Sequence, residues 1–146
     1  MNKPNLNNMA LGALTEKIVI SKFLHNGFDT FEPIITSDID LIVNKKNKFF
    51  RIQIKTSYYV EKTNLFRATI LKSNHNKYNL DNIDYFCIYN YEHNCCYNIP
   101  KGYLKDISGV TLYPHRTREL NREVIFKSGL STDYNKFLDN FDLVDN

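Results

Sequence analysis

The chain has 146 residues, a formal net charge of +3 and 42% hydrophobic residues. This length suits one folded domain, residues 1–146, that buries about two thirds of the surface of its unfolded chain. No apolar run approaches the ~20 residues that cross a bilayer, which argues against a membrane protein. Three cysteines, an odd number, and no signal peptide favour a reducing interior, so we expect a cytoplasmic, intracellular location.

Residues 9–27 predict a helix, because this segment is long and has no internal proline. Glu16 is the unusual residue, since it lies in the middle of an apolar stripe on the helix. The stripe consists of Met9, Gly12, Ala13, Val19, Ile20 and Phe23. Burying an ionised carboxylate is costly unless a cation, a lysine or a metal ion compensates it. We therefore expect Glu16 to face a binding site, and a buried ion pair is the alternative.

A second apolar stripe, formed by Leu11, Leu14 and Ile18, lies on the opposite side of this helix. One sheet cannot cover a helix from both sides, so this stripe predicts self-association. Packing beneath the carboxy-terminal segment is the alternative interpretation.

Six strands are predicted after the helix, near residues 28–35, 39–46, 48–60, 64–71, 84–92 and 95–99. A second helix is expected around Thr132 to Asn140, with Ser131 or Thr132 as its cap. In the strand near 39–46, apolar residues alternate with polar ones. Asp38 and Asp40 both lie on its polar face, where the strand begins.

The strand that contains Arg51-Ile52-Gln53-Ile54-Lys55 has one polar face and one apolar face, because side chains two apart project from the same side. The short polar segment Asn44 to Lys48 predicts a hairpin that places this strand antiparallel to the strand after Asp40. Asp40 is then expected beside Gln53 and Lys55. Taken alone, Gln-x-Lys on a strand is usually solvated surface.

These residue types suit the hydrolysis of phosphodiester bonds. Mg²⁺ prefers hard oxygen ligands and usually takes only one or two carboxylates from a protein, which Asp40 and Glu16 can supply. Gln53 would add a neutral amide oxygen. The ammonium group of Lys55 can orient the attacking water, act as the catalytic base or stabilise charge on the phosphate.

Three motifs follow one another along the chain: Gly12-x-x-x-Glu16, Ser37-Asp38-Ile39-Asp40-Leu41-Ile42 and Arg51-Ile52-Gln53-Ile54-Lys55-Thr56. Their order and spacing resemble the PD-(D/E)XK nuclease superfamily. Within it, the chain is most similar to the group I intron-encoded homing endonucleases, in which glutamine takes the usual acidic position. The run Asp84 to Tyr89, followed by Tyr97-Asn98-Ile99-Pro100, resembles that group as well.

The resemblance implies an α/β fold with a restriction-endonuclease-like core, in which helices flank a central mixed β-sheet. The core would span about residues 9–104, and residues 105–146 would be an extension for DNA contact or oligomerisation. The implied catalytic and metal-binding positions are Glu16, Asp40, Gln53 and Lys55, with Ile54 as a further metal position. Proline is absent before Asp40, and Asp38 offers a competing register two residues earlier.

The expected function is that of a magnesium-dependent DNA endonuclease in which Mn²⁺ can substitute. It would make site-specific double-strand breaks and associate with the nucleoid. Because cutting both strands of a duplex needs two active sites, a homodimer or homotetramer is expected. A Holliday-junction resolvase, a repair, defence or restriction nuclease, and a DNA-binding module without catalysis are the alternatives.

Basic and aromatic residues near the predicted site are candidates for DNA contact. They are Lys45, Lys46, Lys48 and Arg51 in the hairpin, Tyr58 and Tyr59 after Lys55, and Arg116, Arg118 and Arg122 further along the chain. Lysines hold phosphate as point charges, and arginine can hold it with two parallel hydrogen bonds. The alternatives are a soluble hairpin tip for the lysines, a helix surface with ion pairs for the arginines and core packing for the tyrosines.

Overall fold

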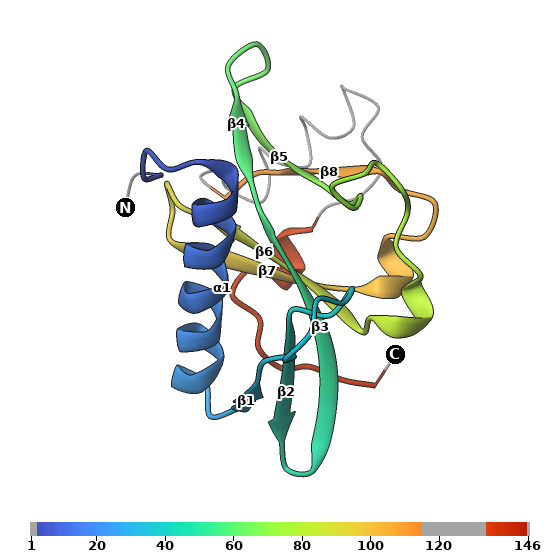
Figure 1. Ribbon diagram of the computed structural model, residues 1–146. Coiled ribbons are helices and arrows are strands. Elements are labelled where there is room, and N and C mark those ends of the chain that lie inside the picture. The colour runs from blue at the N-terminus through green and yellow to red at the C-terminus, as the bar shows by residue number, and fades with distance from the viewer. Residues whose placement is uncertain (1–2, 115–133, 146) are drawn as a thin grey trace.

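A five-stranded mixed sheet forms the centre of the computed structural model, which describes residues 3–114 and 134–145 (Figure 1). In spatial order its strands are β1 (Asp29–Phe31), β2 (Leu41–Lys45), β3 (Lys48–Thr56), β6 (Tyr85–Asn90) and β7 (Cys95–Pro100). Strands β3 and β6 are parallel, and the other neighbours are antiparallel. The predicted α/β class with a mixed sheet is confirmed.

A second, antiparallel sheet covers one face of the first. Its strands are β4 (Tyr58–Val60), β5 (Leu65–Thr69) and β8 (Gly109–Leu112). Phe86 and Ile88 of β6 belong to the same buried cluster as Phe66 of β5 and Leu112 of β8. The two sheets therefore share one apolar core.

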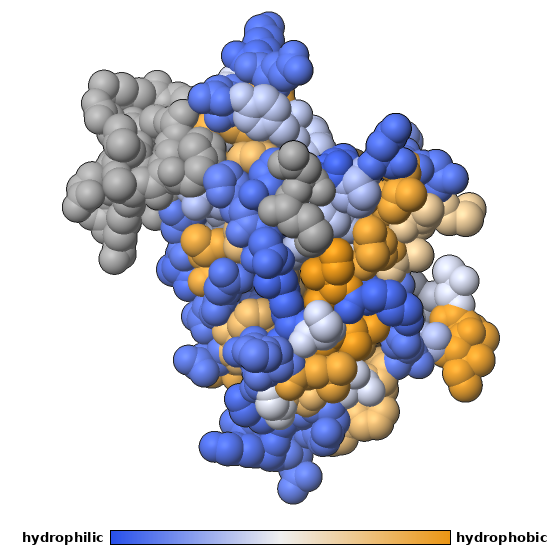
Figure 2. All heavy atoms as spheres, turned by 90° about the vertical axis from the view of Figure 1, so that its left-hand side faces the viewer, coloured by the Kyte–Doolittle hydropathy of each residue, from blue (hydrophilic) through white to orange (hydrophobic). Residues whose placement is uncertain are grey.

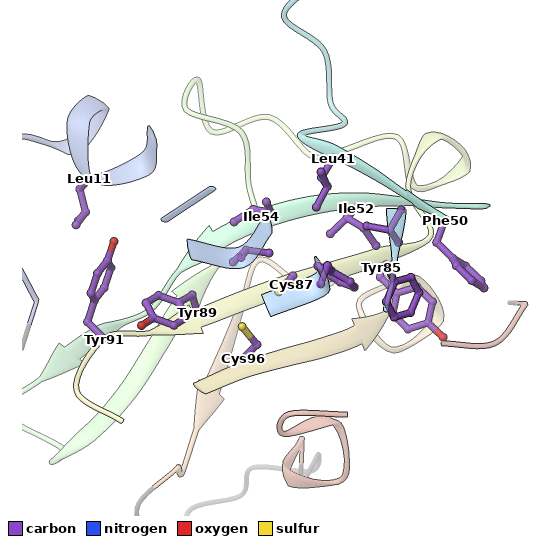
Figure 3. Close-up of a cluster of buried hydrophobic side chains, with 14 residues drawn as sticks. Leu11, Leu41, Phe50, Ile52, Ile54, Tyr85, Cys87, Tyr89, Tyr91 and Cys96 are labelled. Atoms are coloured by element: carbon purple, nitrogen blue, oxygen red, sulfur yellow. The ribbon is translucent and has the colours of Figure 1, made fainter. Parts of the chain in front are cut away.

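Helix α1 (Asn8–His25) covers the other face of the central sheet, and a cluster of buried side chains lies between them (Figures 1 and 3). The Asn7 side chain caps its first turn by accepting a hydrogen bond from the Ala10 amide at 2.8 Å. Beyond its last turn, Gly27 takes a φ of 82°, a conformation that glycine adopts without strain. Of the helices expected to flank the sheet, α1 is the one α-helix among the described residues.

The face that α1 buries differs from the predicted one. The buried residues are Leu11, Thr15, Val19 and Phe23. The predicted stripe was centred on Glu16, but Met9 is 87% exposed and Glu16 is only half-buried, at the flank of the true interface. Thr15 explains the error, because its hydroxyl is buried and donates to the Leu11 carbonyl at 2.8 Å.

The second stripe was also misplaced. Leu11 is buried in the core, and Ile18 packs against it. The exposed apolar side chains of α1 are instead Met9, Leu14 and Leu24. Figure 2 shows apolar atoms among hydrophilic ones on the side of the molecule where α1 lies.

Several predicted boundaries are wrong. The strand near 28–35 is only Asp29–Phe31, and the segment 48–60 is two strands, β3 and β4. Ser57 separates them, since its amide and hydroxyl both donate to the Tyr89 carbonyl, at 2.9 and 3.1 Å. Strand β3 ends at these hydrogen bonds to β6, and the chain then enters the second sheet as β4 (Figure 1).

The other short elements are 3₁₀ turns at Leu80–Asn82, Lys101–Tyr103 and Asn135–Phe137. The last of these stands where part of the helix around Thr132–Asn140 was predicted, and Ser131 and Thr132 lie outside the described residues. Strand β8 was not predicted. Near the carboxy terminus, the Tyr85 hydroxyl donates to the Val144 carbonyl and accepts from its amide, both at 3.0 Å, which holds this segment against β6.

Candidate active site

The β2–β3 hairpin brings the polar residues of the predicted site together. Its turn contains Lys46 and Asn47, with φ values of 53° and 62°, which is the backbone that two-residue hairpin turns favour. In the resulting register Leu41 lies opposite Ile52, and the amide of Asp40 donates to the Ile52 carbonyl at 2.9 Å. The antiparallel pairing expected from the sequence is confirmed.

The carboxylate of Asp40 lies directly against β3. Its Oδ2 atom accepts hydrogen bonds from the Ile54 amide at 2.8 Å and from Gln53 Nε2 at 2.6 Å. The same Gln53 nitrogen donates to the Ile54 carbonyl at 3.2 Å. Three of the predicted metal positions therefore lie within hydrogen-bonding distance of one another: the Asp40 carboxylate, the Gln53 amide and the Ile54 carbonyl. Their role in binding metal stays a prediction.

Glu16 reaches the same place from α1. Glu16 and Asp40 both line an open pocket of about 270 Å³, together with residues of the loop between β1 and β2. Burial, with added repulsion from Asp40 and Glu32, raises the pKa of Glu16. Burial also raises the pKa of Asp40, although the Ile54 amide and the charge of Lys55 act against it. Two carboxyl groups thus share a pocket in which negative charge is unfavourable.

Lys55 lies on the same polar face of β3. Its ammonium group donates to the Leu71 carbonyl at 2.9 Å and lies 4.8 Å from the centre of the Tyr78 ring. Burial lowers the pKa of Lys55, while the charge of Asp40 acts in the opposite direction. A lysine whose pKa is lowered by burial is more readily available as a neutral amine, which a general base requires.

Asp38 occupies a different environment from Asp40. Its Oδ1 atom forms an ion pair with Lys72 Nζ at 3.0 Å, and Lys72 Nζ lies 5.8 Å from the centre of the Tyr78 ring. Lys72 and Tyr78 were not predicted from the sequence. They lie in a polar segment without regular spacing, and a turn in the chain brings them to the site.

The arrangement fits a hard divalent cation. Carboxylate, amide and carbonyl oxygens are the ligands that Mg²⁺ takes, and Asp40, Glu16, Gln53 and Ile54 supply these types. The –NH₂ group of Gln53 lies between oxygens of Asp40 and Ile54, so it interacts with the two groups that a cation would bind. Turning the amide over presents the Gln53 oxygen instead, since the two ends of the amide are nearly identical in shape.

The basic residues of the hairpin have different surroundings. Lys45 Nζ donates to the Asn26 carbonyl at 2.8 Å, and Lys48 lies 3.8 Å from an Asp145 carboxylate oxygen. Lys46 is exposed at the tip of the turn. Arg51 donates through Nε and Nη2 to the two carboxylate oxygens of Asp84, at 3.1 and 2.9 Å. Arg51 therefore ties β3 to the start of β6, and its contact with DNA stays a prediction.

The two tyrosines proposed for DNA contact are exposed on β4. The Tyr59 ring packs against Phe66 with ring centres 5.4 Å apart, and its hydroxyl donates to Asn64 Oδ1. Tyr58 pairs in register with Arg67 of β5, and both side chains are exposed. Arg116, Arg118 and Arg122 lie outside the described residues.

The sequence and the fold can both be compared with known proteins. A model of the PD-(D/E)XK endonuclease family matches residues 6–125. The chain belongs to this family. This match confirms the predicted resemblance and the nuclease class. Nucleases of this family generally use divalent metal ions.

A solved structure shares the fold. A bacterial homing endonuclease, I-Ssp6803I, aligns with a TM-score of 0.70 and 17% sequence identity, over 92% of this chain and 88% of that one. The structure of MepB aligns with a TM-score of 0.46 and 14% identity over 88% and 98% of the two chains, a score too low to support an argument. No protein of curated function matches the sequence.

Three further findings bear on the predictions. None of the helices in residues 3–114 and 134–145 is long and apolar enough to cross a membrane. Cys87, Cys95 and Cys96 are free and buried. Within the same residues, no three His, Cys, Asp or Glu side chains group together as a metal site.

Proposed function

We propose that this PD-(D/E)XK endonuclease hydrolyses phosphodiester bonds of double-stranded DNA in a magnesium-dependent reaction, with Mn²⁺ as a working substitute. The observation that carries this proposal is the pocket shared by Glu16 and Asp40, next to Gln53 and Lys55. Burial raises the pKa of both carboxyl groups, and a bound divalent cation would compensate their charge.

Each residue then has a chemical task. Glu16, Asp40, the Gln53 amide and the Ile54 carbonyl would hold the cation, which when bound would supply positive charge to the phosphate and lower the pKa of water. Lys55 accepts the proton of the attacking water as its amine, because burial lowers its pKa. The Leu71 carbonyl and the Tyr78 ring hold the Lys55 side chain in place.

Within this class we favour a homing endonuclease that makes site-specific double-strand breaks as a homodimer or homotetramer. Support comes from glutamine at position 53 and from the shared fold with a bacterial homing endonuclease. A dimer or tetramer would supply the two active sites that cutting both strands of a duplex requires. Action on DNA inside the cell implies a location at the nucleoid.

One observation favours a second candidate, a DNA-binding module that has lost catalysis. The Gln53 –NH₂ group already satisfies the Asp40 carboxylate and the Ile54 carbonyl, as a cation would. In that case DNA binding would be independent of metal, and no product would form.

Incubation of the protein with a genomic duplex library and with a four-way junction, in Mg²⁺, Mn²⁺ or EDTA, tests the proposal. We expect cutting at few duplex sites in either metal and none in EDTA. Glu16→Gln should abolish cutting, whereas Glu61→Gln, which changes an exposed acid in the β4–β5 turn, should not. A preference for the junction would indicate a resolvase. Metal-independent binding without any product would indicate the inactive module.

A further inference from the structure

A second lysine borders the candidate active site. The segment from Leu71 to Lys77 folds back on itself through a bridge between these two residues, and the Lys72 amide donates to the Asn76 carbonyl at 2.9 Å. The turn is closed by the His75 amide, which donates to the Lys72 carbonyl at 2.9 Å. This turn fixes the backbone at Lys72.

The turn is connected directly to the catalytic lysine. The Leu71 carbonyl, one residue before Lys72, accepts the hydrogen bond from Lys55 Nζ. The ammonium groups of Lys55 and Lys72 lie 4.8 and 5.8 Å from the centre of the same Tyr78 ring. Both cations are therefore held around one aromatic side chain at the edge of the site.

Lys72 remains accessible from solvent. Its side chain is 34% exposed, and its ion-pair partner Asp38 is 24% exposed. An ammonium group has three hydrogen-bond donors, so the contact with Asp38 leaves capacity for another acceptor. Because the ammonium groups of Lys55 and Lys72 lie beside the same Tyr78 ring, a DNA strand whose scissile phosphate lies at Lys55 comes within reach of Lys72.

We propose that Lys72 is a phosphate-binding residue for the cleaved DNA strand, and that Asp38 and Tyr78 position it to hold a phosphate beside the scissile one. This inference rests on the proposed function, since it requires a DNA strand in the site. Asp38 then acts as the positioning partner of Lys72. Asp40, two residues later, remains the cation ligand.

The alternative is a purely structural ion pair. A partly exposed pair of this kind contributes little to stability, and it would be insensitive to DNA. The two interpretations predict different results for DNA binding, which can be measured without cleavage.

The test measures binding of a fluorescent duplex of arbitrary sequence in EDTA, over a series of salt concentrations. Each phosphate contact contributes about 0.9 to the slope of log affinity against log salt. We expect Lys72→Ala to lower this slope by about 0.9 and Lys72→Arg to restore it. The matched control is Lys77→Ala in the same turn, whose side chain is 68% exposed and lies 3.8 Å from Asp106. That variant should keep the wild-type slope.

An unchanged slope in a folded Lys72→Ala variant overturns the inference. An equal decrease of the slope in Lys77→Ala also overturns it. Asp38→Asn tests the positioning role, since it breaks the ion pair while keeping Lys72. It should lose part of the contribution of Lys72 to the slope, and a full wild-type slope in this variant would overturn the positioning role of Asp38. The outcome is separable from that of the proposed function: a Lys72-dependent slope in a protein that never cuts DNA supports the phosphate contact and refutes the nuclease.

Discussion

Replacing Asp40 with asparagine should make the metal-free protein more stable and remove its response to magnesium. The Asp40 carboxylate is partly buried in the pocket that it shares with Glu16, and burial raises the pKa of both groups. A carboxyl group whose pKa is raised by folding holds its proton to higher pH than in the unfolded chain. The metal-free fold therefore loses stability as the pH rises through that raised pKa, and a neutral side chain avoids this loss.

The size of the magnesium response follows from binding to the folded state alone. For a weak carboxylate site with a Kd of about 1 mM, about 10 mM Mg²⁺ stabilises the fold by about 1.4 kcal/mol. In a chain of this size, that corresponds to a rise in Tm of roughly 3 to 6 °C. Asp40→Asn should show little of this rise, because it removes the ligand closest to Gln53 and Ile54.

Thermal unfolding with and without MgCl₂, at matched ionic strength, measures this response. Wild-type protein should gain less from magnesium as the pH is lowered through the raised pKa of these carboxyl groups, because protons then compete with the cation. Glu61→Gln serves as the control for loss of a surface charge. A full magnesium response in Asp40→Asn, or none in the wild type, would refute the assignment of this pocket as the metal site.

Three other predictions concern the fold and the surface. Asp84→Ala should lower the free energy of unfolding, measured by urea titration, by about 1–2 kcal/mol. Asp84→Asn should lower it by less, because the asparagine oxygen can still accept the hydrogen bond that the Arg51 amide donates to Asp84 Oδ2 at 2.8 Å. Phe23→Ala should lower the free energy of unfolding by about 3–5 kcal/mol, because it truncates a large core side chain. Met9→Ala should change this free energy by less than about 0.5 kcal/mol. Equal losses in the two variants would contradict the observed orientation of α1. Lys46→Asn, which suits the left-handed backbone of the turn, should lower the salt slope of DNA binding by about 0.9 if this hairpin contacts phosphate.

The polar side of the site was predictable because it depends on local rules. Alternation along β3 places Gln53 and Lys55 on one face, and a short polar turn sets the register that brings Asp40 to them. Both are consequences of strand geometry and hairpin length. The same rules place Ile52 and Ile54 in the core, where they are buried.

The orientation of α1 was not predictable in the same way. Thr15 lies at the centre of the buried face, and its hydroxyl lies 2.8 Å from that of Thr56 and 3.0 Å from that of Tyr91. These partners come from distant parts of the chain, so a pattern of apolar residues on the helix cannot reveal them. A polar residue with distant partners therefore shifted the predicted stripe away from the true one.

Lys72 and the end of β3 have similar explanations. Nothing in the spacing around residue 72 predicts that a turn brings its side chain to Asp38. The break after Thr56 depends on hydrogen bonds from Ser57 to the Tyr89 carbonyl, a strand away in space. Both features arise from tertiary contacts that override local pattern.

In the proposed mechanism, Lys55 acts in hydrolysis at a site that binds a divalent cation. Its most direct test is the rate of DNA cleavage by Lys55→Ala under single-turnover conditions in Mg²⁺, with Lys62→Ala, an exposed lysine in the β4–β5 turn, as the control. The rate should fall by at least about 100-fold in Lys55→Ala, the contribution expected of a general base, while the rise in Tm with magnesium persists. Cleavage by Lys55→Ala at the wild-type rate would contradict this account.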